Sequence, residues 1–289
     1  MKRTLLEGGG QAKRASHFAG DLLLRLAVVF LLVQLIAFYK FFVDDAFISF
    51  RYARNLVIGN GLVFNPGCRV EGYSNFLWVV ALAGINWLGV DVVLASKLLG
   101  FGSIVSVIAL SYALYQRLPG RDSVHASGVA LLLASSLPIV YFGIAGMETT
   151  FFSAWLVAAV YIFVAHGNRL TGAATLCICA AALTRPDGVL YFPVALIAES
   201  FESTGVDRRK VGSVVPFGAV YAIWILWRRG YYGDWLPNTF YAKLPSNLDN
   251  PIVSGLDEPY RFVLTNGGPL FLVPKQALGD KIHAAEPEV

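Results

Sequence analysis

The sequence predicts an all-α protein that crosses a membrane several times. Of its 289 residues, 56% are hydrophobic and 15% are charged, whereas a soluble domain carries about 25% charged residues. Long apolar runs recur along the chain, and residues 26–39 contain only Gln34 as a polar interruption. A large soluble core does not need runs of this length, whereas a helix that crosses a bilayer does.

Seven apolar runs are the expected crossings: residues 22–42, 93–115, 126–142, 150–165, 170–183, 189–198 and 211–227. The runs 170–183 and 189–198 are short, and Pro193 interrupts the second, so this pair is a candidate hairpin that stops below the outer surface. Residues 1–21 are basic and glycine-rich, and we expect a disordered cytoplasmic leader there. Residues 22–243 form the transmembrane domain, and 244–289 form an outer-face tail with an incomplete further helix.

The basic residues predict how the chain is oriented. They gather in four segments: the N-terminus and residues 116–125, 166–169 and 200–210. Cytoplasmic loops are enriched in lysine and arginine, and all four segments can face the cytoplasm only if residues 76–90 do not cross. We therefore expect 76–90 to be juxtamembrane or re-entrant. The outer side then receives residues 43–91, 146–150, 184–188 and 228–243. Arg228 and Arg229 oppose this assignment, because they fall on the outer side.

Two adjacent carboxylates, Asp44 and Asp45, open a helix-like segment after the first run. On a helical wheel the segment has a polar and an apolar face, so we expect it to lie flat on the bilayer. The polar face comprises Asp44, Asp45, Ser49, Arg51, Tyr52 and Asn55. One aspartate suffices to cap a helix, and a second adds repulsion and desolvation. Besides capping, we consider a general base, with the second carboxylate orienting the first or holding Mg, Mn or Ca against a phosphate.

Further candidate ligands lie in the other predicted outer segments. Glu71, Tyr73 and Asn75 suit sugar hydroxyls, or belong to an ordinary structured loop. Glu148 requires a distant partner or a ligand. Arg185 either binds a phosphate or pairs with Asp187. Lys243 is a second phosphate candidate or an interfacial lysine. The set of expected substrate-binding residues is completed by Arg51, Arg54, Asp187, Asn238 and Tyr241.

Several other classes are disfavoured. The sequence has no GxSxG, HExxH or P-loop motif. The net charge is +4, and the lysines and arginines gather between the apolar runs. This distribution is explained by membrane loops and requires no nucleic-acid partner. The three cysteines indicate neither a disulfide framework nor a metal knuckle.

The segments DDAFISFRYARNLVIGNGLVFNPGCRVEGYSNFLW, GMETT, TRPDG and GDWLPNTFYAK resemble bacterial GT-C type membrane glycosyltransferases, the branch with the terminal arabinofuranosyltransferases of actinobacterial cell walls. The resemblance covers about residues 22–243. It implies a GT-C-like helical bundle with an amphipathic juxtamembrane helix in the first outer loop. Members usually continue through further membrane helices, so this chain resembles a shortened form.

The resemblance also implies a reaction. An inverting transferase of this kind moves arabinofuranose or another sugar from a polyprenyl-phosphate donor to a glycan or glycolipid acceptor, on the outer face of the plasma membrane. Asp44 or Asp45 is then the base, while Glu148, Arg185 and Lys243 hold donor phosphate and acceptor. The alternatives are a non-catalytic protein that binds or assembles lipid-linked sugars, and a transporter or flippase.

Overall fold

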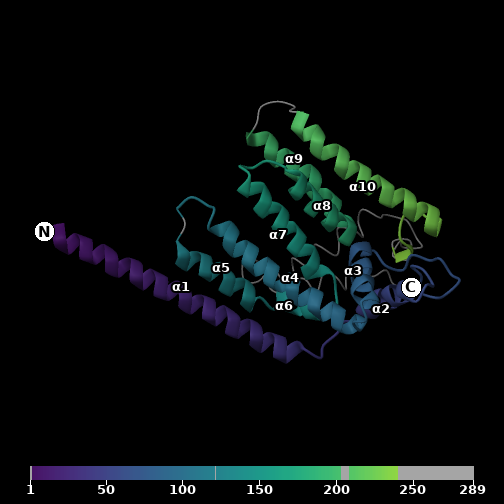
Figure 1. The fold of residues 1–289 in the computed structure, drawn as a ribbon, viewed down its shortest axis with the longest axis horizontal. Helices are drawn as coiled ribbons and strands as arrows, with labels where there is room; N and C mark the ends of the chain where they lie inside the picture. The colour runs from purple at the N-terminus through teal and green to yellow at the C-terminus, as the bar shows by residue number, and fades with distance from the viewer. Residues whose placement is uncertain (1, 121, 203–207, 240–289) are drawn as a thin grey trace, which may run out of the picture. The chain divides into compact units, whose positions relative to one another are not determined.

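The computed structural model describes residues 2–120, 122–202 and 208–239, and every named element within these ranges is a helix. Figure 1 shows long helices running side by side. The elements that form this bundle are α1 (Lys2–Phe38), α4 (Val92–Tyr115), α5 (Ser123–Ser135), α6 (Leu137–Ile144), α7 (Thr149–Ala165), α8 (Gly172–Thr184), the 3-10 helix η1 (Pro186–Leu190), α9 (Tyr191–Glu202) and α10 (Arg208–Tyr232). Helix α1 packs on α5, α4 on α5 and α7, and α8 on α7 and α10.

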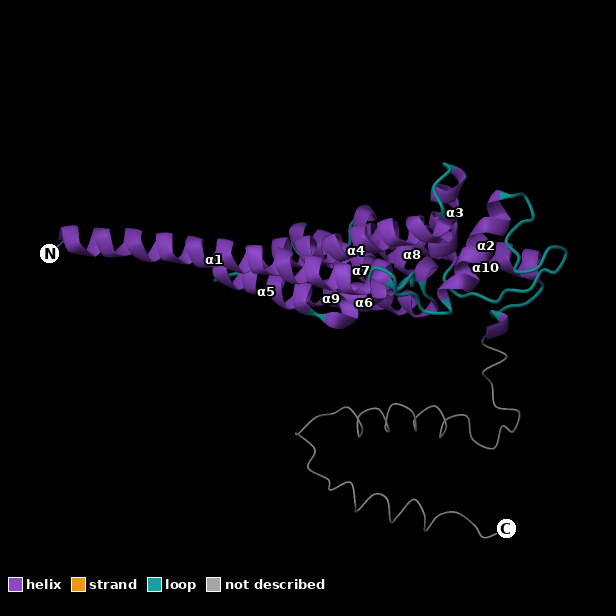
Figure 2. Cartoon of the chain, turned by 90° about the horizontal axis from the view of Figure 1, so that it is seen from below, coloured by secondary structure: helices purple, strands orange, loops and turns teal. Residues whose placement is uncertain are grey.

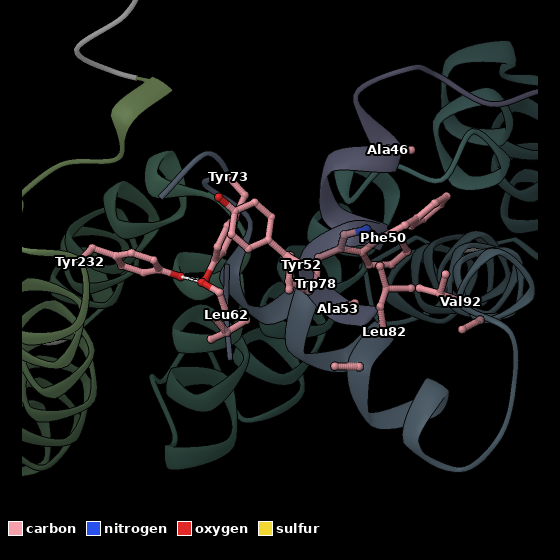
Figure 3. Packing of buried hydrophobic residues seen from close by; sticks show 13 residues of the cluster. Ala46, Phe50, Tyr52, Ala53, Leu62, Tyr73, Trp78, Leu82, Val92 and Tyr232 are labelled. Carbon is pink, nitrogen blue, oxygen red and sulfur yellow. Dashed lines mark hydrogen bonds between the residues drawn. The ribbon is translucent and has the colours of Figure 1, made fainter. Parts of the chain in front are cut away.

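Two shorter helices gather at one end of the bundle. Helices α2 (Ala46–Val57) and α3 (Phe76–Trp87) pack against each other, near the end of α10 (Figures 1 and 2). A buried cluster joins them, with Tyr52, Trp78 and Leu82 at its centre (Figure 3). Helix α3 has 12 residues, or about 18 Å, which is less than a hydrocarbon core of about 30 Å. Its length suits a segment that does not cross.

Among the described residues, two helical segments are long and apolar enough to cross a membrane, Ser16–Phe38 and Val92–Tyr115. A third is possible if α5 and α6 act as one span bent by 53°. The bend follows from Pro138, because proline has no N–H to donate to the carbonyl four residues earlier and so ends α5. The described part of the chain is thus all-helical, with two or three candidate spans. The expectation of seven crossings stays a prediction.

Helix α1 begins at Lys2, so the structure differs from the expected disordered leader at residues 1–21. No proline interrupts residues 2–38, and extending an existing helix adds one hydrogen bond for each residue fixed. Pro193 also behaves differently from expectation. It falls in the first turn of α9, where a proline removes no helical hydrogen bond, so it does not interrupt that helix.

The expected polar face of α2 is wrong in part, because Ser49, Tyr52 and Asn55 are buried. Their polar atoms find partners within the protein. The Tyr52 hydroxyl donates to the Val70 carbonyl over 2.6 Å, and Asn55 Nδ2 donates to the Val63 carbonyl over 2.7 Å. This face therefore packs against the loop between α2 and α3 instead of facing water.

Candidate functional site

Asp44 and Asp45 lie exposed between α1 and the first turn of α2. Asp45 occupies the N-cap position, yet its side chain makes no capping hydrogen bond. The backbone satisfies the first turn instead, because the Asp44 carbonyl accepts from Phe47 N and the Asp45 carbonyl accepts from Ile48 N. Neither carboxylate takes part in the ion pairs of the described chain. Both remain available for a ligand.

The turn before α7 holds the start of α2 in place. Val43 N donates to the Ala145 carbonyl over 3.1 Å. Gly146 follows with a φ of +84°, a conformation that favours glycine, and a Cβ there would lie 2.9 Å from Ala46 Cβ and from Phe50 Cζ. A larger residue at 146 would push α2 away. The GMETT segment and the aspartate pair therefore meet through close backbone packing.

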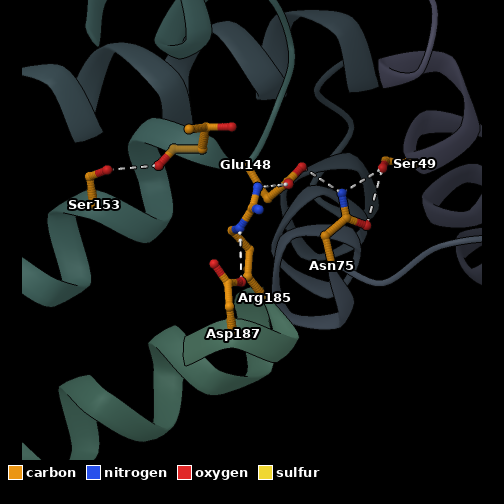
Figure 4. A network of polar contacts seen from close by, with 7 residues as sticks. Ser49, Asn75, Glu148, Ser153, Arg185 and Asp187 are labelled. Carbon is orange, nitrogen blue, oxygen red and sulfur yellow. Dashed lines mark hydrogen bonds and ion pairs between the residues drawn. The ribbon is translucent and has the colours of Figure 1, made fainter. Parts of the chain in front are cut away.

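A polar network crosses from α2 to the end of α8 (Figure 4). Asn75 Nδ2 donates to Ser49 Oγ over 3.0 Å and to Glu148 Oε2 over 2.9 Å. Arg185 Nη1 donates to Glu148 Oε1 over 3.2 Å, and its Nε donates to Asp187 Oδ1 over 3.1 Å. The network thus joins three of the four segments expected on the outer side, 43–91, 146–150 and 184–188.

Burial differs along this network. The Glu148 side chain is 8% exposed, whereas the side chains of Arg185 and Asp187 are 37% and 53% exposed. Glu148 has the distant cation that its sequence context lacks, and Arg185 pairs with both acids. A buried carboxylate thus fixes one edge of a guanidinium that still reaches solvent.

Asp45 stands one helical turn from this network. Residues four apart on a helix are neighbours on its surface, with Cβ atoms about 5–6 Å apart. Asp45 therefore lies on the stripe of α2 that carries Ser49, which bonds to Asn75. The exposed carboxylates and the Arg185 guanidinium belong to one end of the bundle.

Glu71 has a structural contact. Its Oε2 lies 2.6 Å from Arg228 Nε, and both side chains are 5% exposed. Arg228 Nη2 also donates to the Trp235 carbonyl, and Asn238 N donates to the Glu71 carbonyl. Burial raises the pKa of the Glu71 carboxyl, and the charge and hydrogen bond of Arg228 oppose that rise. The pair fixes the loop before α3 to the end of α10, and it gives Arg228 an acid partner at that end.

Tyr73 is enclosed by the protein rather than exposed to a sugar hydroxyl. It is 4% exposed, and its hydroxyl lies 3.1 Å from the Tyr232 hydroxyl, which donates to the Leu62 carbonyl. Burial raises the pKa of the Tyr73 hydroxyl above its usual range. Figure 3 shows the two tyrosines meeting from α10 and the loop before α3.

The remaining candidates lie at the surface or outside the described residues. Arg51 is exposed, donates to the Phe64 carbonyl and to Asn65 Oδ1, and lies over the Phe64 ring. Arg54 and Asn238 are exposed. Tyr241 and Lys243 lie outside the described residues. All the expected substrate-binding roles stay predictions.

Sequence reasoning missed Lys97 at this end, and it placed Ser49 on a polar face without its link to Asn75. Lys97 Nζ donates to the Phe41 and Ile144 carbonyls, next to the aspartate pair. The sequence does contain a signal for a functional role of Lys97. It is the one charged residue of run 93–115, and ionisable residues within membrane helices are usually functional. For Ser49 as a link to Asn75, the sequence contains no comparable signal.

An apolar cavity of about 460 Å³ opens between α4, α7, α8 and α9. Its lining is almost entirely hydrophobic and includes Leu114, Phe163 and Tyr191. Tyr191 contacts the Phe152 ring, and that ring lies 5.7 Å from the Arg185 guanidinium carbon. One end of the cavity therefore approaches the polar network.

The chain is similar to two curated proteins that are each named terminal beta-(1->2)-arabinofuranosyltransferase. The protein from Mycobacterium tuberculosis is 28% identical over 220 residues, which cover 71% of this chain and 35% of that protein. The protein from Corynebacterium glutamicum is 28% identical over 244 residues, which cover 72% of this chain and 34% of that protein. The chain thus spans about a third of the length of these relatives. No protein-family model and no solved structure matches it. The predicted resemblance to terminal arabinofuranosyltransferases is confirmed.

Proposed function

We propose that this chain forms the catalytic membrane region of an inverting GT-C type glycosyltransferase. It moves arabinofuranose or another sugar from a polyprenyl-phosphate donor to a cell-envelope glycan on the outer face of the plasma membrane. One observation carries the proposal: Asp44 and Asp45 are adjacent and exposed, Asp45 makes no capping hydrogen bond, and it lies one helical turn before Ser49, which joins the Glu148–Arg185 network through Asn75. The printed names of the two similar proteins support the same reaction class.

The reaction requires a base at the acceptor and positive charge at the leaving group. Asp44 or Asp45 removes the proton of the acceptor hydroxyl, and the oxygen attacks the anomeric carbon from the face opposite the phosphate. The bond between that carbon and the phosphate oxygen breaks, and its electron pair leaves with the phosphate. Because phosphate is a stable leaving group, the step requires no general acid.

Arg185 is the described cation best placed to receive the phosphate, since its guanidinium reaches solvent while Glu148 orients it. Glu148 and Asp187 together exceed the charge of Arg185, so a phosphate requires a second cation. Lys243 is one candidate.

A divalent cation is another candidate: Asp44 and Asp45 offer the oxygen ligands that Mg, Mn and Ca prefer, and the ion would neutralise phosphate charge. Among the described residues, no three His, Cys, Asp or Glu side chains cluster as a metal site, although Mg often binds through one or two carboxylates plus phosphates.

The cavity between α4, α7, α8 and α9 supports a lipid-linked donor. Its hydrophobic lining suits an isoprenoid chain, and the end marked by Tyr191 lies near Arg185 through Phe152. A single ligand with an anionic head and an apolar tail would match both features.

The proposal is tested with Asp44→Asn and Asp45→Asn in proteoliposomes that contain radiolabelled polyprenyl-phosphate arabinose and a glycan acceptor. Loss of a general base lowers rates by about 10²–10⁴-fold, and we expect such a loss of transfer in one or both variants while donor binding persists. Asp91→Asn is the matched control, because Asp91 is an exposed acid that caps α4 and asparagine caps equally well. Undiminished transfer in both aspartate variants would disprove the mechanism. Donor binding without any transfer by the unmodified chain would favour a binding protein, and donor movement across the bilayer would favour a flippase.

A further inference from the structure

Lys97 lies in the second turn of α4, inside one of the candidate membrane spans. Its Nζ donates to the Phe41 carbonyl over 2.9 Å and to the Ile144 carbonyl over 2.6 Å, and lies 3.7 Å from the centre of the Phe42 ring. The ion pairs found in the described chain do not include this lysine. Its ammonium group is therefore directed at backbone rather than at an acid.

A lysine at this place is unfavourable on its own. A cation within a membrane helix is costly. Two carbonyls that lack helical partners offset this cost, because Ile144 ends α6 and Phe41 follows the end of α1. A leucine or methionine would fill the same space without the charge, but it would release both carbonyls.

The two carbonyls flank the contact that fixes the aspartate pair. Val43 N donates to the Ala145 carbonyl. Lys97 donates to the carbonyls of Phe41, two residues before Val43, and Ile144, the residue before Ala145. Three hydrogen bonds thus clamp segment 41–43 to turn 144–146. The first segment leads directly into Asp44, and only Met147 separates the second from Glu148.

We propose that Lys97 is a positioning residue, which sets the aspartate pair against the Glu148–Arg185 network. This inference rests on the proposed function for its catalytic consequence. A misplacement of about 1 Å can lower a rate about 100-fold. Releasing the clamp should therefore lower kcat while the KM for the donor changes little, because the Lys97 ammonium group is already bonded to two backbone carbonyls.

The first test compares kcat and KM of Lys97→Met, Lys97→Arg and Gln34→Met in proteoliposomes with the labelled donor. Lys97→Met keeps a long side chain and removes charge and donors, whereas Lys97→Arg keeps both. Gln34 is the matched control, because its Nε2 also donates to a carbonyl of another element, Ala134, and neither residue belongs to segment 41–43 or turn 144–146. We expect a loss in kcat of about 10- to 100-fold for Lys97→Met, partial rescue in Lys97→Arg, and little change for Gln34→Met.

The second test follows the segment itself with a nitroxide at position 47. Phe47 is 52% exposed in the first turn of α2, so Phe47→Cys in a Cys68→Ser background gives a labelling site. Electron paramagnetic resonance spectra should show a more mobile label with Lys97→Met and an unchanged label with Gln34→Met.

Three results would overturn the inference: a normal kcat in Lys97→Met, an equal loss in Gln34→Met, or a loss of kcat with no change in the label. If the unmodified chain transfers no sugar, the proposed function fails, and the nitroxide spectra still decide whether Lys97 clamps the segment.

Discussion

At the scale of single residues, Glu71 shows how burial changes the meaning of an acid. The carboxylate belongs to a loop expected to face a sugar, yet it lies 2.6 Å from a buried guanidinium nitrogen of Arg228. Sequence alone predicts neither the partner nor the burial, because the two residues are 157 positions apart. The pairing of Arg185 with Asp187 was predictable, since a local contact follows from spacing. The link from Arg185 to Glu148 was not.

Removing one member of the buried pair should destabilise the fold strongly. Arg228→Met leaves Glu71 buried without its cation, and breaking such a pair costs about 3–5 kcal/mol. Arg229→Met is the control: it removes the same charge from the next position, where the side chain is exposed and lies over Trp235. Thermal unfolding in detergent, followed by near-UV circular dichroism, should show a much lower midpoint for Arg228→Met. The double variant Glu71→Gln/Arg228→Met should recover part of the loss, and equal midpoints for the two arginine variants would contradict this reading.

At the scale of elements, the sequence predicts where a helix forms better than it predicts what surrounds that helix. The run 93–115 corresponds to α4 (Val92–Tyr115) almost residue for residue, because a long apolar run has few alternatives to a helix. The environment of α2 was misjudged, since a helical wheel assigns polar residues to water. Tyr52 and Asn55 instead bond to carbonyls of a neighbouring loop, and no periodicity in α2 reveals that loop.

The crossing of α4 and α6 depends on the absence of a side chain at Gly100. A Cβ there would lie 1.7 Å from the Gly143 carbonyl oxygen, so the backbones must separate to admit it. Small residues permit such close helix contacts in membranes. Gly100→Ala should therefore destabilise the protein by about 1–3 kcal/mol. Gly102→Ala on the same helix meets no atom within 4 Å and should leave the unfolding midpoint unchanged or raised. Matching midpoints in the two variants would show that the helices are not held this closely.

At the scale of the whole molecule, the arrangement of the helices gathers the sequence motifs at one end. Helix α2, the start of α3, the turn before α7 and the end of α8 meet through the Ser49–Arg185 network. The expected crossings and the positions of the basic residues together predicted that these segments share one side of the membrane. The number of crossings predicts on which side of the membrane a segment lies, but it does not predict side-chain contacts. It therefore could not predict that Glu71 and Tyr73 would be enclosed at that end.

The same number of crossings makes a prediction about sidedness. Phe47 is exposed in α2, and Leu118 is exposed in the connector that contains Arg117. Single cysteines at these positions, in a Cys68→Ser background, should react differently with a membrane-impermeant maleimide added to intact cells. Position 47 should be labelled from outside, and position 118 should be labelled only after the membrane is opened, because basic connectors favour the cytoplasm. Labelling of both positions from the same side would remove the basis for outer-face transfer, since Asp44 and Asp45 lie three and two residues before position 47.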